Sequence, residues 1–163
     1  MRDDPIDVLI EQWRAVRPDI DPAPMALVGR LLRVARMSDR AVGDTLAAHD
    51  LPPGWFDVLS ALRRSGEKLT PGALAGAVML STGGMTKRLD QMETGGLLRR
   101  SPDPRDRRGL LIALTPKGRR VVDRAVEAHV ANEERLLSGL SAAERRRLDG
   151  LLRKLEASVV AAR

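Results

Sequence analysis

The sequence predicts a mainly helical fold of the α+β class, in which one β-hairpin interrupts a series of helices. Apolar residues recur at helical spacing through most of the 163-residue chain. Two apolar runs, at residues 97–101 and 109–114, flank the charged segment DPRDRR, and this pattern is typical of a hairpin. Because closely spaced helices precede the hairpin, the order of elements predicts a winged helix-turn-helix flanked by N- and C-terminal helices.

Residues 1–50 predict two N-terminal helices. The first covers about residues 6–16, where apolar side chains recur at i, i+3, i+4 and i+7: Ile6, Leu9, Ile10 and Trp13. The proline-containing link RPDIDPAP separates it from a long helix over about residues 23–49, whose inward face is expected to contain Val28, Leu31 and Leu32. We expect this segment to form a dimerisation layer and a candidate lid over a ligand.

Residues 51–114 predict the lobe that carries the hairpin. Its first helix is expected over residues 53–65, with Pro53 at the first helical position. Four residues at helical spacing should form its buried face: Trp55, Val58, Leu59 and Leu62. The sequence therefore places a packed helix directly before the helix-turn-helix.

Two further helices complete the helix-turn-helix. Thr70 followed by Pro71 begins a short helix, because a threonine cap and a proline at the first position both favour a helix start. The second helix ends at about Thr94, before a Gly-Gly pair, and is expected to be capped by Ser81 or Thr82. Its position before the hairpin makes it the predicted recognition helix.

Residues 115–163 predict two C-terminal helices. The first begins after Thr115 and continues to about residue 137. Ser141 and Glu144 form the sequence pattern of a capping box at the start of the second. Five apolar residues line one face of this last helix: Leu148, Leu151, Leu152, Leu155 and Val159. A terminal helix with such a face must bury it, so we expect the N- and C-terminal helices to form a homodimer.

Composition narrows the classes of function. The formal net charge of +6 suggests a polyanionic partner, although a basic solvated surface gives the same charge. The chain has no cysteine and two distant histidines, so the sequence predicts no metal and no cofactor. It offers no nucleophile–base pair or phosphate loop of an enzyme. No run of about 18 apolar residues occurs, so we expect a cytoplasmic protein without a membrane partner.

The charged segment between the two apolar runs is the candidate wing. Residues 99–108 carry five arginines against two aspartates, a net charge of +3. A wing tip lies beside the DNA duplex, where the narrow minor groove attracts arginine and a carboxylate can hold a guanidinium in one geometry. We therefore expect Asp103, Arg105 and Arg107 to contact DNA. A solvated basic loop is the alternative interpretation.

Helical geometry divides the recognition helix between two faces. Met85, Leu89 and Met92 share one stripe and are expected to pack inward. The residues expected to face the DNA groove, with the first two near phosphates or base edges at the helix start, are Ser81, Thr82, Gly83, Thr86 and Lys87. Arg88 flanks the inward stripe, which aims it poorly at DNA and lets it reach back toward the dimer layer.

Over about residues 23–160 the sequence resembles the MarR family of bacterial transcriptional regulators. The resemblance rests on DPRDRR followed by an apolar strand and LTPKG, and on LTPGALAGAVMLSTGGMTKRLDQMETGGLLRR at residues 69–100. It implies a winged helix-turn-helix homodimer that binds double-stranded DNA, usually as a repressor. It also implies that Arg105 enters the minor groove and that Asp103 braces it.

A narrower resemblance is to the urate-responsive branch of that family. It rests on a tryptophan in an extra N-terminal helix, on HDLPPGWFDVLSALRRSGEKLTP at residues 49–71, and on STGGMTKRLD at residues 81–90. It implies an anion pocket made by Trp13, Asp57, Arg64 and Arg88. A related branch with nearly the same residues responds to other small carboxylates. Asp57 and Arg64 are seven residues apart, so we expect them to share one side of their helix. The structural alternatives are hydrophobic packing for the tryptophan and a solvated polar face for this pair.

These patterns lead to one hypothesis and two alternatives. The hypothesis is a homodimeric regulator, by family tendency a repressor, that binds a pseudo-palindromic operator and is released by a small anion such as urate, a related purine or a carboxylate. The first alternative is a winged-helix DNA-binding protein without a small-molecule ligand. The second is a helical protein-interaction module whose positive charge is incidental.

Overall fold

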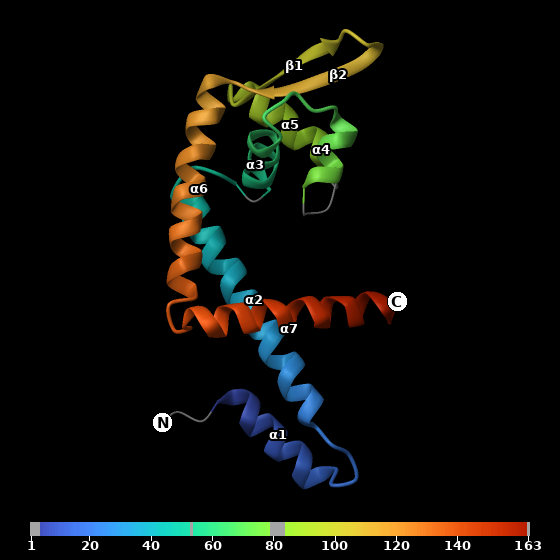
Figure 1. The fold of residues 1–163 in the computed structure, drawn as a ribbon, viewed down its shortest axis with the longest axis vertical. Coiled ribbons are helices and arrows are strands. Elements are labelled where there is room, and N and C mark those ends of the chain that lie inside the picture. Colours follow the sequence, from blue (N-terminus) through green and yellow to red (C-terminus); the bar gives the residue numbers. More distant parts are fainter. Residues whose placement is uncertain (1–3, 53, 79–83, 163) are drawn as a thin grey trace. The chain divides into compact units, whose positions relative to one another are not determined.

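The computed structural model describes residues 4–52, 54–78 and 84–162, and it confirms a mainly helical fold with one β-hairpin (Figure 1). The elements follow the predicted order: α1 (Pro5–Val16), α2 (Ala23–Ala47), α3 (Trp55–Ser65), α4 (Pro71–Ala77), α5 (Met85–Thr94), β1 (Leu98–Asp103), β2 (Asp106–Leu114), α6 (Pro116–Leu136) and α7 (Ala142–Ala161). The chain divides into two compact units, residues 1–43 and residues 44–163. None of the described helices is both long enough and apolar enough to span a membrane.

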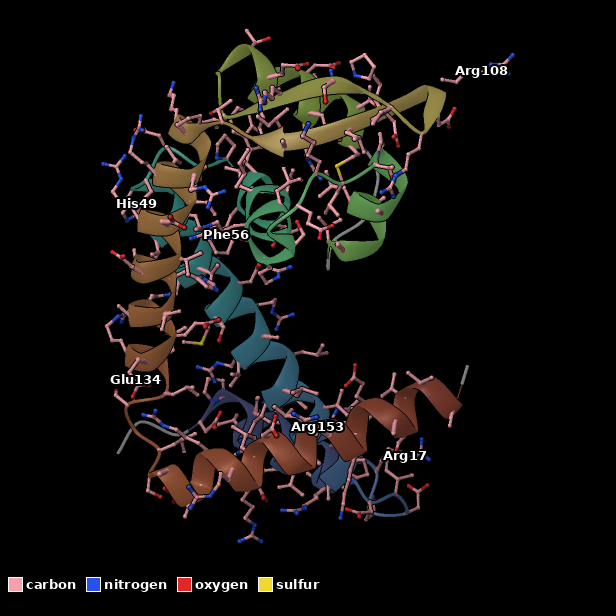
Figure 2. All side chains as sticks on the ribbon, turned by 45° about the horizontal axis from the view of Figure 1, so that its top comes forward. Arg17, His49, Phe56, Arg108, Glu134 and Arg153 are labelled. Atoms are coloured by element: carbon pink, nitrogen blue, oxygen red, sulfur yellow. The ribbon has the colours of Figure 1, made fainter. Side chains whose placement is uncertain are left out.

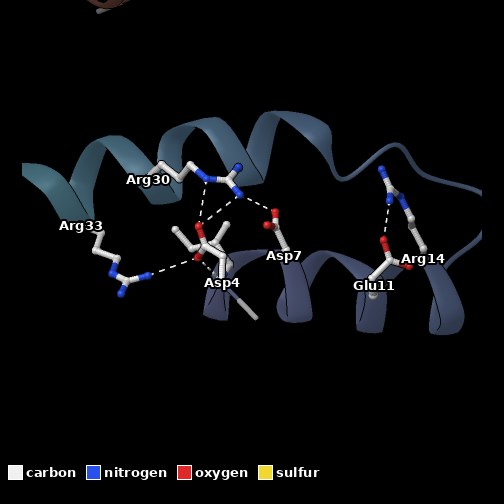
Figure 3. Close-up of polar contacts among 7 residues, drawn as sticks. Asp4, Asp7, Glu11, Arg14, Arg30 and Arg33 are labelled. Carbon is white, nitrogen blue, oxygen red and sulfur yellow. Dashed lines mark hydrogen bonds and ion pairs between the residues drawn. The ribbon is translucent and has the colours of Figure 1, made fainter. Parts of the chain in front are cut away.

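In the N-terminal unit, ion pairs tie α1 to the first part of α2 (Figure 3). Asp4 caps α1 by accepting a hydrogen bond of 2.9 Å from the backbone amide of Ile6. The same carboxylate pairs with Arg30 at 3.4 Å and with Arg33 at 3.2 Å, and Asp7 also pairs with Arg30. The amide of Ile6 and the nearby Arg30 hold the pKa of Asp4 below its usual value near 3.8. The contacts of this carboxylate therefore persist as the pH falls toward that usual value and are lost only in stronger acid.

The face of α2 that was expected to pack inward is exposed in the single chain. Val28, Leu31 and Leu32 are 51%, 37% and 52% exposed, so that prediction is wrong for one copy of the protein. These side chains stay exposed because α1, with 12 residues, is too short to cover α2, which has 25. One short helix cannot cover the whole apolar face, which leaves these side chains available to a partner.

The core of the C-terminal unit is shared by α3, α4, α5, the hairpin and α6 (Figure 1). Its most deeply buried side chains include Val58, Leu59, Leu74, Met92, Leu98, Ile112 and Val122. The strands β1 and β2 pair antiparallel, with Leu98 opposite Leu114 and Arg100 opposite Ile112. Leu69, between α3 and α4, exchanges backbone hydrogen bonds of 3.0 and 2.8 Å with Ile112, a pairing that the sequence did not predict. This bridge ties the helix-turn-helix to the wing.

Two helices begin later than predicted, because a glycine occupies the capping position of each. Helix α3 starts directly after Gly54, whose φ is 80°, and α5 starts directly after Gly84, whose φ is 76°. This left-handed backbone is accessible to glycine and strained for other residues. The predicted helix start at Pro53, and the predicted capping of the recognition helix by Ser81 or Thr82, are therefore wrong. Those three residues themselves lie outside the described residues.

The other predicted helix starts are confirmed. Thr70 and Thr115 each accept a hydrogen bond from the amide three residues later, at 3.1 and 3.0 Å. Ser141 and Glu144 form the predicted capping box at the start of α7. No residue of α7 is buried, and its apolar stripe is exposed along its whole length: Leu148, Leu151, Leu152, Leu155 and Val159.

The start of α6 is clamped against the end of the recognition helix. Thr115 Oγ1 and Lys117 Nζ donate hydrogen bonds of 2.6 and 2.9 Å to the two carbonyls of the Gly-Gly turn that follows α5. Gly118 lies so close to this turn that a Cβ built on it would be 1.8 Å from the carbonyl oxygen of Leu97. The LTPKG stretch therefore fixes where α5 ends relative to α6.

Candidate nucleic-acid interface and ligand cavity

The recognition helix α5 has one buried and one exposed face, as its sequence predicts. Its inward stripe is at most 9% exposed and consists of Met85, Leu89 and Met92. Thr86 and Lys87 are exposed on the other face, where a DNA groove can reach them. Three further residues that the sequence assigns to DNA lie outside the described residues: Ser81, Thr82 and Gly83.

The wing is a tight hairpin in which both aspartates hold backbone amides. The strands end at Asp103 and resume at Asp106, so the turn is Pro104 and Arg105, and most of the charged segment belongs to the strands. Asp103 Oδ1 accepts from the amide of Arg105, and Asp106 Oδ1 accepts from the amide of Arg108, each at 2.9 Å. We expected Asp103 to brace the guanidinium of Arg105, whereas the structure shows its carboxylate bonded to the backbone amide of that residue. The carboxylate braces the backbone, because the amide two residues ahead is the donor nearest to an aspartate in a turn.

Arginine side chains extend from this hairpin into solvent. Arg105 and Arg108 are exposed, and Arg108 lies at the far end of the hairpin (Figure 2). The side chain of Arg107 is outside the described part of the wing. Because the amide of Arg105 is held by Asp103, its guanidinium is presented from a fixed turn. That arrangement suits insertion into a narrow minor groove.

A further arginine, which the sequence analysis missed, joins the wing to the recognition helix. Arg100 on β1 pairs with Asp90 at 2.6 Å and with Glu93 at 3.0 Å, and both acids belong to α5. The backbone amide of Arg100 also donates to Glu93 at 2.7 Å. The helix and the hairpin are thus held at one spacing. The two acidic residues three positions apart, near the end of the recognition helix, are the signal that could have indicated this contact.

Arg88 leaves the recognition helix toward the start of α3. Its guanidinium lies against Gly54, where an added Cβ would be 3.0 Å from Arg88 Cζ. Gly54 is the N-cap of α3 and precedes Asp57 by three residues. The contact therefore joins the recognition helix to the end of α3 that carries Asp57.

Asp57 and Arg64 line one cavity of about 810 Å³ between α3 and α6. Its other lining residues are Phe56, Ser60, Arg63, Asp123, Val126, Glu127 and His129. An ion pair of 2.6 Å between Arg63 and Asp123 links the two helices beside it. The prediction that Asp57 and Arg64 share one side of their helix is confirmed, because both line this cavity.

Two buried polar atoms of this cavity have no hydrogen-bond partner among the described residues. They are Ser60 Oγ and His129 Nδ1. The rings of Phe56 on α3 and His129 on α6 are in contact, with centroids 4.8 Å apart, so the Phe56 side chain points from α3 toward α6 (Figure 2). Buried polar groups are nearly always hydrogen-bonded in folded proteins. These two atoms are therefore unsatisfied polar groups on residues that line the cavity.

The four residues predicted for an anion pocket fall in three places. Asp57 and Arg64 line the cavity, whereas Arg88 is not among its lining residues and lies against Gly54. Trp13 belongs to α1 in the N-terminal unit and is 37% exposed. The Arg64 guanidinium donates a hydrogen bond of 3.5 Å to the backbone carbonyl of Ala77 on α4, and among the described residues no ion pair joins Asp57 to Arg64 or Arg88. The geometry thus brings two of the four residues together directly.

Comparison with known proteins identifies the class of this interface. The model of the MarR family matches residues 49–109, which extend from the turn before α3 into the wing. The HTH-type transcriptional regulator PecS of Dickeya dadantii is 39% identical over 154 residues, which cover 93% of each chain. This chain belongs to the MarR family.

Solved structures of MarR proteins agree with the fold. A cysteine-to-serine variant of Escherichia coli MarR in complex with operator DNA matches with a TM-score of 0.69 and 27% identity, covering 88% of this chain and 96% of that one. Bordetella bronchiseptica BpsR, whose DNA binding is regulated by 6-hydroxynicotinic acid, matches with a TM-score of 0.69 and 31% identity over 79% of this chain and 92% of BpsR. The chain is thus a MarR-type DNA-binding transcriptional regulator.

Proposed function

We propose that this MarR-family regulator is a homodimeric repressor that binds a pseudo-palindromic operator and is released by a small planar anion. Urate, a related purine or an aromatic carboxylate are the candidate ligands. The observation that carries the proposal is the contact of Arg88 with Gly54. It connects the recognition helix to α3, which lines the cavity with Asp57 and Arg64.

In this proposal α5 contacts base pairs in the major groove, and the wing contacts the minor groove and the phosphates. The residues assigned to the major groove are Ser81, Thr82, Gly83, Thr86 and Lys87. Arg105 enters the minor groove, Asp103 fixes the turn that presents it, and Arg107 adds positive charge beside the phosphates. Arg100 is a positioning residue, because its ion pairs with α5 set the spacing between helix and wing.

The cavity between α3 and α6 suits a flat ligand with a negative charge. Arg64 supplies a guanidinium, and Phe56 supplies an aromatic wall. Ser60 Oγ and His129 Nδ1 offer buried polar atoms, and Asp57 can accept a hydrogen bond from a ring N–H or a hydroxyl. BpsR, a relative of similar fold, is regulated by an aromatic carboxylic acid, which supports a ligand of this class.

Arg88 is the residue proposed to couple ligand binding in the cavity to DNA binding by α5. An anion bound beside α3 attracts its guanidinium away from Gly54, and the exposed face of α5, with Thr86 and Lys87, moves with it. Trp13 is proposed to stack on the bound ligand as part of a lid. The ligand then has different affinities for two conformations, which any switch requires. A coupling of about 1–3 kcal/mol corresponds to about 5- to 150-fold weaker operator binding.

The test measures affinity for duplex DNA from the region upstream of the protein's own gene, by fluorescence anisotropy at fixed salt. Urate, xanthine and 6-hydroxynicotinate are added one at a time. An effective ligand should weaken operator binding by about 5- to 150-fold. Arg64→Met should abolish that response, because it removes the guanidinium of the cavity. Arg88→Met should retain part of the DNA affinity and lose the response.

Arg119→Met is the matched control, because Arg119 is an exposed arginine of α6 outside the lining of the cavity. It should respond to ligand like the natural protein. If no ligand of either class changes operator affinity or melting temperature, the protein is a MarR-type DNA-binding protein without a small-molecule ligand.

The exposed stripe of α7 carries the proposal of a homodimer. Leu151 and Leu155 are 54% and 37% exposed and lie one helical turn apart, a surface that a second copy would cover. The double variant Leu151→Glu, Leu155→Glu is expected to be a monomer in size-exclusion chromatography with light scattering. Its operator affinity should fall about 100-fold or more, since two half-sites are no longer bound by one assembly.

Leu110→Glu is the control for this pair, because Leu110 is a leucine on β2 whose exposed fraction, 44%, lies between those of Leu151 and Leu155. It should remain a dimer. A double α7 variant that also remains a dimer would show that the stripe does not form the interface.

A further inference from the structure

A second cavity lies within the C-terminal unit and shares no lining residue with the cavity between α3 and α6. It encloses about 580 Å³, within the range of small-molecule sites. Three segments that are far apart in the sequence form it: the turn from α2 into α3, the end of α5, and the first half of α6. His49, from the first of these segments, lies beside α6 (Figure 2).

The wall that α6 contributes is positively charged. Lys117, Val121 and Arg124 are spaced i, i+4 and i+7, so they share one face of the helix. Asp50 is the one carboxylate of the lining, and His49 adds an imidazole. Two permanent positive charges against one negative charge favour an anionic occupant.

The two cations have hydrogen-bonding capacity to spare. Lys117 Nζ donates to the backbone carbonyl of Gly95 at 2.9 Å, which fixes the ammonium at the edge of the cavity. An ammonium has three donors, so two N–H groups are available for a ligand. Arg124 is exposed and forms no ion pair with another described residue. A carboxylate between these two groups would accept charge-assisted hydrogen bonds from both.

The rest of the lining is apolar and aromatic. Leu51 and Leu97 are 2% and 6% exposed, and the half-buried Trp55 supplies an indole. A flat ring gains free energy from burial on such a surface and from stacking against an indole. The combination of an apolar floor with a cationic wall is the arrangement expected of a site for an aromatic anion.

We propose that this cavity binds a small aromatic carboxylate, with the carboxylate between Lys117 and Arg124 and the ring packed on Trp55 and Leu97. The site is separate from the ligand site proposed above, and its occupancy does not depend on that proposal. It would give the protein two places for organic anions, one beside α3 and one at the end of the recognition helix.

The experiment uses 2-naphthoate as probe and the fluorescence of Trp55 as readout, in full-length protein with Trp13→Phe. The chain has two tryptophans, so Trp55 is then the remaining one. We expect saturable quenching, with affinity about tenfold lower or more in Lys117→Met and in Arg124→Met. The uncharged 2-naphthamide, of nearly the same shape, should also bind about tenfold more weakly or worse. Arg119→Met, on another face of α6, should match the parent.

Arg64→Met locates the binding, because Arg64 lines the other cavity. It should leave the quenching unchanged. Loss of quenching in Arg64→Met, without an effect of the α6 variants, would place the probe beside α3 and overturn the proposal. Absence of saturable quenching, or equal affinity for the acid and the amide, would also overturn it. Circular dichroism checks folding, and Arg124→Met decides the test if Lys117→Met does not fold.

Discussion

Gly118→Ala is expected to destabilise the C-terminal unit by about 3 kcal/mol or more. The added Cβ would lie 1.8 Å from the carbonyl oxygen of Leu97 and 2.8 Å from its carbonyl carbon. Both are backbone atoms that cannot rotate away, so α6 must shift. That shift also strains the hydrogen bonds from Thr115 and Lys117 to the end of the recognition helix. The melting temperature should fall by about 6–12 °C, measured by circular dichroism.

Gly43→Ala is the matched control, because an added Cβ at this position in α2 meets nothing within 4 Å. Alanine is the better helix former, so this variant should gain about 0.5–1 kcal/mol. Operator affinity should fall in Gly118→Ala and not in Gly43→Ala, since only the first disturbs the end of α5. A Gly118→Ala protein with the melting temperature of the natural protein would contradict the close packing of α6 on Leu97.

Arg105→Ala is expected to weaken operator binding by about 1–3 kcal/mol for each wing, and so by about 30-fold or more for a dimer with two bound wings. The guanidinium that we assign to the minor groove is lost, and the slope of log affinity against log salt should also decrease in magnitude. The fold should not change, because Arg105 is an exposed turn residue whose amide, held by Asp103, is retained. Fluorescence anisotropy over a series of salt concentrations measures both effects.

Two comparisons separate the geometry of this contact from its charge. Arg105→Lys keeps the charge without the planar fork and should bind with intermediate affinity. Arg14→Ala removes one positive charge from α1, where Arg14 pairs with Glu11, and should change affinity little. If Arg105→Ala binds the operator as tightly as the natural protein, the assignment of this residue to the minor groove fails.

The sequence by itself determined the features whose interactions are local. The caps at Thr70, Thr115 and Ser141 each bond to the amide three residues later, so four neighbouring residues contain the whole signal. The buried stripe of α5 follows from helical periodicity for the same reason. The shared face of Asp57 and Arg64 is another consequence of helical spacing, and the structure confirms it.

Only the tertiary structure decided where the long side chains point and which elements complete a cavity. His129 of α6 joins Asp57 of α3 in one cavity, although the two residues are distant in the sequence. Lys117 reaches the carbonyl of Gly95, and Arg88 lies against Gly54, because packing brings those backbone segments within reach. Helical periodicity gives the direction in which a side chain leaves its helix, whereas the partner it meets depends on how the elements pack.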